Sequence, residues 1–175
     1  MAGKIKLIIF DLDGVLVEAK NIHYEALNEA LGNEYAISWN EHLSTYDGLK
    51  TTQKLEMLSE KKGLPIDSHN DIWEFKQELT LQKLRALEPN SGLIQCMTNL
   101  VSEGYKIAVC SNSIRKTCLT VLSKLGLMEY MDLVISNEDV KNGKPHPEMY
   151  WKAISMMSCL PEETLIVEDS PYGLL

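Results

Sequence analysis

The stretch that decides the fold runs from Lys4 to Glu18 and reads KIKLIIFDLDGVLVE. Its nearly unbroken apolar run, residues 5–10, is typical of a strand covered on both faces in a parallel sheet. The run ends at two carboxylates, Asp11 and Asp13, and Gly14 follows directly. Ligands of open α/β sheets bind beyond the carboxyl ends of the strands, and glycine permits a tight turn there. This segment alone is equally compatible with a reaction or metal site and with a solvated Asp-rich turn.

Bulk composition narrows the class of protein. With 175 residues, 45% of them hydrophobic, the chain can form one domain, or one domain that carries an insertion. Its net charge of −8, without a basic cluster, argues against nucleic acid and anionic membranes as partners. No apolar run approaches the roughly 20 residues that span a bilayer, and the start lacks a signal-peptide pattern. We expect a cytoplasmic monomer.

The four cysteines form no C-x-x-C pair, and each lies in an apolar context. This pattern favours buried, reduced thiols over zinc ligands or disulfides. They are Cys96, Cys110, Cys118 and Cys159.

Strand and helix patterns alternate in the second half of the chain. Apolar strands are expected at residues 105–110, 132–136 and 164–169. A helix is expected before each of these strands, at residues 93–101, 114–125 and 149–157 respectively. Such alternation implies a parallel sheet with right-handed crossovers, which is an α/β, Rossmann-like three-layer core.

Residues 18–87 show helical spacing instead. We expect a helix that Gly32 ends, a mixed segment, a second helix that Gly63 ends, and a third capped by Asp67 or Ser68. The apolar face of the third helix would hold Ile72, Phe75, Leu79 and Leu84. Because this block contains no convincing strand, it predicts a helical cap at 18–87, inserted into a core formed by residues 1–17 and 88–175.

Polar side chains follow three of the predicted strands. Besides Asp11 and Asp13, the second strand ends at Ser111 and Asn112 and the fourth at Glu168 and Asp169, so all should share one rim. Lys144, in the loop NGKPHPEMY, could reach the same rim. Acids of this kind bind a hard divalent cation, which we expect to be Mg2+, and the cation with Lys144 would neutralise a phosphoryl group.

Each of these residues also has a structural interpretation. Ser111 could cap the next helix, Lys144 could be a solvated loop lysine, and Glu168 could be a surface acid. The remaining histidines, His42, His69 and His146, are expected to be structural or solvated.

The four motifs DLDGV, CSNS, GKPHPE and VEDSPYG resemble, in content and order, those of the haloacid dehalogenase (HAD) superfamily of phosphatases and phosphomutases. The resemblance spans nearly the whole chain. The helical insert is similar to the C1-type cap of the β-phosphoglucomutase and phosphoglycolate phosphatase branch.

The resemblance implies roles for individual residues. Asp11 would be the nucleophile and a metal ligand, and Asp13 the general acid and base, its backbone carbonyl a further ligand. Ser111 would hydrogen-bond the phosphoryl oxygens and Lys144 would steady nucleophile and phosphate. Asp169, helped by Glu168, would hold the Mg2+. Asn112 and the cap residue His23 are candidates for substrate binding, although His23 fits a packing role equally well.

Two departures from the family pattern concern the substrate. Residues 17–19 replace the usual tail of the first motif, and a cap arginine that mutases carry after a glycine is missing. Here the stretch runs from Gly48 to Thr51, in which Lys50 could hold a phosphate only as a point charge. This favours a monoester phosphatase over a mutase.

The sequence stops at Leu175, less than two turns into a helix expected from Ser170-Pro171 onward. We expect a truncated form of a longer phosphatase, which could impair activity. The hypothesis is a Mg2+-dependent phosphatase of a small phosphorylated metabolite, acting through an aspartyl phosphate. The alternatives are a sugar-phosphate mutase, a receiver-type phospho-accepting domain, against which the insert argues, and an inactive binding module.

Overall fold

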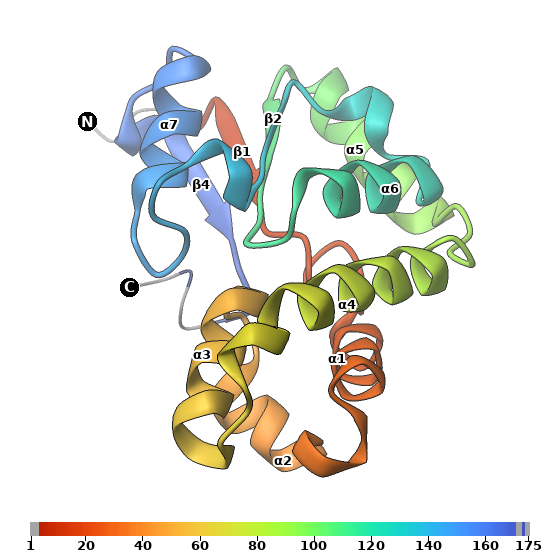
Figure 1. Ribbon diagram of the computed structural model, residues 1–175. Helices are drawn as coiled ribbons and strands as arrows, with labels where there is room; N and C mark the ends of the chain where they lie inside the picture. Colours follow the sequence, from red (N-terminus) through yellow and green to blue (C-terminus); the bar gives the residue numbers. More distant parts are fainter. Residues whose placement is uncertain (1–3, 171–172, 174–175) are drawn as a thin grey trace. The chain divides into compact units, whose positions relative to one another are not determined.

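The computed structural model describes residues 4–170 and Gly173, and Figure 1 shows the elements. It divides into two compact units. The core unit consists of Met1–Glu18 and Leu87–Leu175, and the helical unit of Ala19–Ala86. The helix expected from Ser170-Pro171 onward falls on residues of which the structure describes only Ser170 and Gly173.

The core unit contains a parallel sheet with strand order β3-β2-β1-β4. The central strand, β1 (Leu7–Phe10), is buried along its whole length, as its unbroken apolar run predicts. It pairs with β2 (Lys106–Cys110) and with β4 (Thr164–Val167), while β2 also pairs with β3 (Leu133–Ile135). The predicted α/β fold is confirmed, and all four strands end at the same rim.

Helices cover both faces of this sheet (Figure 1): α7 (Glu148–Met156) lies on one face, and α5 (Ser91–Ser102) and α6 (Arg115–Lys124) on the other. The side chains of α7 pack with those of β1, β2 and β3 in one apolar cluster. Three short 3-10 helices lie in the connections: η3 (Met128–Tyr130), η4 (Asn137–Asp139) and η5 (Pro161–Glu163).

The helical unit contains no strand in residues 19–86, all of which the structure describes. Its elements are α1 (Lys20–Tyr35), α2 (Trp39–Glu41), a π-helical turn η1 (His42–Tyr46), α3 (Thr51–Lys62), η2 (Ile66–Ser68) and α4 (His69–Leu84). It has an apolar cluster of its own, built around Leu27, Tyr46, Leu55 and Leu58. This unit therefore has a separate core.

One local prediction is confirmed in part and two are wrong. Gly32 interrupts the regular helix as predicted, because its φ of 69° and ψ of 177° are not helical, but a further helical turn follows this kink and α1 extends to Tyr35. Phe75 is 47% exposed, since α4 buries the neighbouring stripe that includes Lys76, Thr80 and Leu84. Cys96 is exposed on α5, although all four cysteines are free.

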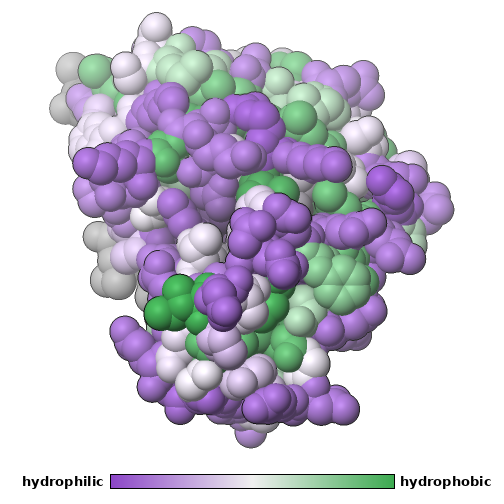
Figure 2. All heavy atoms as spheres, viewed as in Figure 1, coloured by the Kyte–Doolittle hydropathy of each residue, from purple (hydrophilic) through white to green (hydrophobic). Residues whose placement is uncertain are grey.

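Hydrophilic residues dominate the face shown in Figure 2, where hydrophobic residues form small separate patches. Within the described part of the chain, no helix combines the length and the apolar character that crossing a membrane requires.

Candidate metal-dependent active site

The chain leaves β1 through a tight turn that places both predicted aspartates at the rim. The Asp11 amide donates to the Val167 carbonyl at 2.9 Å, which anchors it beside β4. Gly14, with a φ of +91°, closes the turn by donating to the Val17 carbonyl at 2.7 Å. Asp13 then accepts a hydrogen bond of 3.0 Å from the Ser113 hydroxyl, at the end of β2.

The loop that carries Lys144 is held by side chains on both sides. Asn112 accepts from the Lys144 amide at 2.9 Å and donates to the Lys144 carbonyl at 3.1 Å. Glu148, in the first turn of α7, accepts from the backbone amides of Lys141 and Asn142. Asn112, predicted to bind substrate, thus uses its side chain to position Lys144.

Lys144 is the centre of the charged cluster. Its ammonium nitrogen donates to Asp11 Oδ1 at 2.7 Å and to Glu168 Oε2 at 2.8 Å. Lys144 is only 5% exposed and the Glu168 side chain only 1%. The interpretations of Lys144 as a solvated lysine and of Glu168 as a surface acid are therefore wrong.

Burial and neighbouring charge set the protonation of this cluster. Burial raises the pKa of Asp11 to about 7, and Glu168 and Asp13 act in the same direction, while the Lys144 ammonium opposes them. Burial would lower the pKa of Lys144, but Asp11, Tyr150 and Glu168 raise it above its ordinary value. Lys144 therefore stays protonated, and additional positive charge at the rim would favour the ionised form of Asp11.

The residues present fit a divalent cation. Asp11, Glu168 and Asp169 each offer a carboxylate oxygen, and these oxygens lie within 4.8 Å of one another. Hard oxygen donors suit Mg2+, and three carboxylates exceed the single charge of Lys144. Gly14 makes room for the cluster, because a Cβ there would lie 2.1 Å from Asp169 Oδ2. The Asp13 side chain is not part of this group of carboxylates. The predicted role of Asp13 as a metal ligand through its backbone carbonyl stays a prediction.

Ser111 is buried at the end of β2, and its hydroxyl accepts from the Ser113 amide at 3.0 Å. The N-cap of α6 is Ile114, so Ser111 does not cap this helix. Its hydroxyl is held by the turn that also orients Ser113 toward Asp13.

Three predicted substrate residues lie in the helical unit. His23, on α1, has its ring Nδ1 3.4 Å from the ammonium nitrogen of Lys76 on α4. Gly48, with a φ of +74°, and Lys50 immediately precede α3. Their role in substrate binding stays a prediction.

Sequence reasoning missed two residues of the core unit. Tyr150 falls within the helix predicted at 149–157 and was given no role there, yet its hydroxyl lies 3.3 Å from Glu168 Oε2. Ser113 was quoted only as part of a motif, although it hydrogen-bonds Asp13. A buried tyrosine hydroxyl needs a polar partner, and this rule was the available signal for Tyr150.

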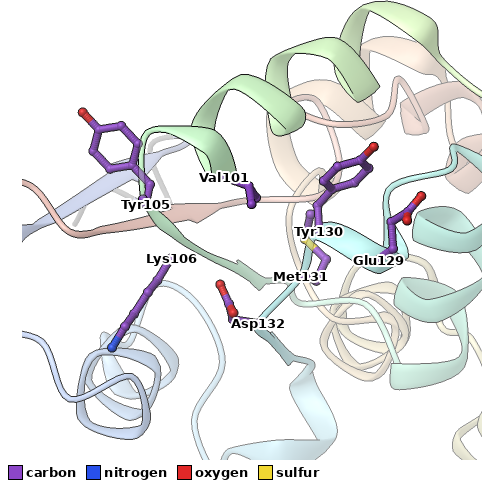
Figure 3. Close-up of a pocket in the computed structure, with 8 residues that line it drawn as sticks. Val101, Tyr105, Lys106, Glu129, Tyr130, Met131 and Asp132 are labelled. Carbon is purple, nitrogen blue, oxygen red and sulfur yellow. The ribbon is translucent and has the colours of Figure 1, made fainter.

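A hollow of about 360 Å³ lies elsewhere in the core unit (Figure 3). Lys106, the first residue of β2, and Asp132, just before β3, are among the residues that line it. Asp132 is engaged as an acceptor for the Ile107 amide at 2.8 Å, and Lys106 donates to the Met157 carbonyl at 2.7 Å. Because this hollow lies at the amino ends of the strands, it is separate from the carboxylate rim.

Comparison with known proteins agrees with this geometry. The model of the haloacid dehalogenase-like hydrolase family matches residues 8–175. The chain belongs to that family. The predicted HAD resemblance is therefore confirmed, and with it the assignment to a family of hydrolases.

Among the relatives is a phosphorylated carbohydrates phosphatase from Thermotoga maritima, 27% identical, with 97% of this chain and 79% of the relative covered. Two solved structures share the HAD fold. β-Phosphoglucomutase from Clostridium difficile has a TM-score of 0.85 at 23% identity, covering 97% of this chain and 78% of the other. A mutant of CbbY from Rhodobacter sphaeroides, in complex with xylulose-(1,5)bisphosphate, has a TM-score of 0.87 at 22% identity, covering 97% and 80%.

Proposed function

We propose that this HAD hydrolase is a Mg2+-dependent phosphatase of a small phosphorylated metabolite. The observation that carries the proposal is the sharing of the Lys144 ammonium between Asp11 and Glu168, at a rim where Asp169 adds a third carboxylate. This arrangement combines a carboxylate nucleophile with the positive charge that a phosphoryl group requires. The phosphatase relative supports the reaction class.

Asp11 is the proposed nucleophile. Its carboxylate would attack phosphorus, form an aspartyl phosphate and release the substrate's oxygen, so that one difficult displacement becomes two easier ones. Water would then cleave the intermediate and regenerate the carboxylate. Asp11 suits this role because it is held at the strand end by backbone and ion-pair contacts.

Asp13 is the proposed general acid and base. It would give its proton to the leaving oxygen in the first step and take one from the attacking water in the second. The Ser113 hydroxyl, 3.0 Å from Asp13 Oδ2, would keep the carboxyl group in place through both steps.

Positive charge and hydrogen-bond donors would bind the phosphoryl group. Lys144 would offset its charge, and the Ser111 hydroxyl would donate to one of its oxygens. Asp11, Glu168 and Asp169 would hold the Mg2+, with the Asp13 carbonyl as a further ligand, and a cation there supplies charge that stabilises the transferring group.

We also propose that the helical unit acts as a cap that selects the substrate, with His23, Gly48 and Lys50 as contributors. Phosphorylated carbohydrates are the first substrate class to test, since the curated relative is named for them. A sugar-phosphate mutase is the alternative. It would convert a hexose phosphate into its isomer when the matching bisphosphate is supplied.

The test is release of phosphate from an aryl phosphate with and without Mg2+, followed by a panel of phosphorylated carbohydrates. Wild-type protein should release phosphate only with Mg2+, and Asp11→Asn should release none. Equal rates for the two proteins would refute Asp11 as nucleophile. Isomerised product without net phosphate release would favour the mutase.

A further inference from the structure

Tyr150 brings a hydroxyl group to the carboxylate rim from the buried side of α7. It is the third residue of that helix, only 7% exposed, and its neighbours in the apolar cluster include Met149 and Ala153. Phenylalanine would fill the same apolar space. The hydroxyl, which is costly to bury without a partner, lies 3.3 Å from Glu168 Oε2.

The ring of Tyr150 also faces the lysine of the cluster. The Lys144 ammonium nitrogen lies 5.4 Å from the ring centroid, within the range of a cation–π interaction. Tyr150 therefore contacts Lys144 through its ring and Glu168 through its hydroxyl. One side chain thus touches both partners of this ion pair.

Both donors to Glu168 use the same carboxylate oxygen. Lys144 donates to Oε2 at 2.8 Å and the Tyr150 hydroxyl to Oε2 at 3.3 Å. A carboxylate has about four acceptor positions on two oxygens, so these two donors leave part of the acceptor capacity of Glu168 for a further partner. Asp11 and Asp169 place their own carboxylate oxygens within 4.8 Å of the oxygen that Glu168 offers.

We propose that Tyr150 is a positioning residue for the cation site: with Lys144 it holds the Glu168 carboxylate by Oε2, so that this group stays beside Asp11 and Asp169, where the three carboxylates can bind the divalent cation. The proposal rests on the Mg2+-dependent function proposed above. A glutamate loses considerable rotamer freedom when it binds a metal, and a partner that orders it beforehand removes part of this cost.

Tyr150→Phe tests the proposal because it removes only the hydroxyl. Mg2+ affinity is measured from the Mg2+ dependence of the melting temperature, without turnover. Loss of an outer hydrogen bond to a metal ligand typically weakens metal binding by about tenfold or more, and we expect about tenfold here. In steady-state assays kcat should fall at limiting Mg2+ and recover at high Mg2+.

Tyr130→Phe is the matched control. Tyr130 lies in the same unit, in η3 beside the separate hollow in Figure 3, and its hydroxyl lies 3.2 Å from the Thr98 hydroxyl. Its Mg2+ affinity should equal that of the wild type. The double variant Glu168→Gln/Tyr150→Phe should bind Mg2+ as weakly as Glu168→Gln alone, because the hydroxyl acts through Glu168.

The proposal is overturned if Tyr150→Phe binds Mg2+ within twofold of the wild type, whether or not its melting temperature falls. A further loss of affinity in the double variant would overturn it as well. These measurements stay decisive if the wild type binds Mg2+ but releases no phosphate, a result that would refute the proposed function alone.

Discussion

Replacing Asp11 by asparagine should stabilise the cation-free protein while it abolishes turnover. Asp11 is 7% exposed, and burial together with Glu168 and Asp13 raises its pKa from 3.8 to about 7 although Lys144 opposes the shift. Ionisation of the Asp11 carboxyl group therefore costs more free energy in the folded protein than in the unfolded chain, and it lowers the stability of the fold. Asparagine resembles the protonated form and avoids this cost.

The size of the effect follows from the pKa difference. A folded pKa above the unfolded value means that the wild type loses stability as pH rises from about 4 to about 7. A difference of about three pKa units corresponds to about 4 kcal/mol at pH 8. Asp11→Asn should gain up to this amount at pH 8 and almost nothing at pH 4.

The assay is urea unfolding in EDTA at pH 8 and at pH 4, repeated in Mg2+ at pH 8. A cation at 100 times its dissociation constant adds about 2.7 kcal/mol to the free energy of unfolding of the wild type. The difference in stability between Asp11→Asn and the wild type should therefore be smaller in Mg2+ than in EDTA. Asp67→Asn, at an exposed aspartate of η2, is the control and should change stability by less than about 0.5 kcal/mol. A variant that is no more stable than the wild type at pH 8 in EDTA would refute the argument from buried charge.

Three further predictions concern single residues. Gly14→Ala should weaken Mg2+ binding by about tenfold or more, measured by thermal shift, because its Cβ would lie 2.1 Å from Asp169 Oδ2. Burial lowers the pKa of His42 from 6.5 to about 4, so the wild type should lose up to about 3 kcal/mol as pH falls between those values, and His42→Phe should remove that loss in urea titrations. Asn112→Ala should cost about 2 kcal/mol of stability and lower kcat more than it changes KM, because two hydrogen bonds to the Lys144 backbone disappear.

Each of these predictions has a distinct control or contrary result. Gly104, with a φ of +85° and nothing within 4 Å of an added Cβ, carries the same backbone strain, so an equal Mg2+ effect in Gly104→Ala would contradict the argument for Gly14. The loss of stability as the pH falls from 6.5 to about 4 should remain in His146→Gln, which is the control. If the same loss also remains in His42→Phe, His42 is not its source. A normal kcat for Asn112→Ala would show that Lys144 is positioned without this amide.

The order of apolar and polar residues along the chain determined the sheet and the rim at which its charged residues gather. A strand buried on both faces needs an unbroken apolar run, which residues 5–10 supply, and parallel strands bring their carboxyl ends to one rim. Polar residues placed at those ends along the chain therefore lie near one another in the fold. Asp11, Glu168 and Asp169 meet for this reason.

Periodicity was less informative about which residues of a helix are buried. Periodicity placed Phe75 on the apolar face of α4, and the apolar context of Cys96 indicated a buried thiol, yet both residues are exposed. An error of one position rotates a helical residue by about 100°, which moves it from the buried side to the edge. Neighbouring elements decide which stripe is covered.

Only the tertiary structure decided the contacts that tune the site. The Asn112 side-chain amide hydrogen-bonds the Lys144 backbone, 32 positions away in the sequence. The Tyr150 hydroxyl hydrogen-bonds Glu168, 18 positions away. Hydrogen bonds depend on distances of a few tenths of an ångström and on orientation, neither of which residue spacing encodes. The sequence by itself therefore determined which charged groups share the rim, whereas packing of α7 and the Lys144 loop decided which atoms hold them there.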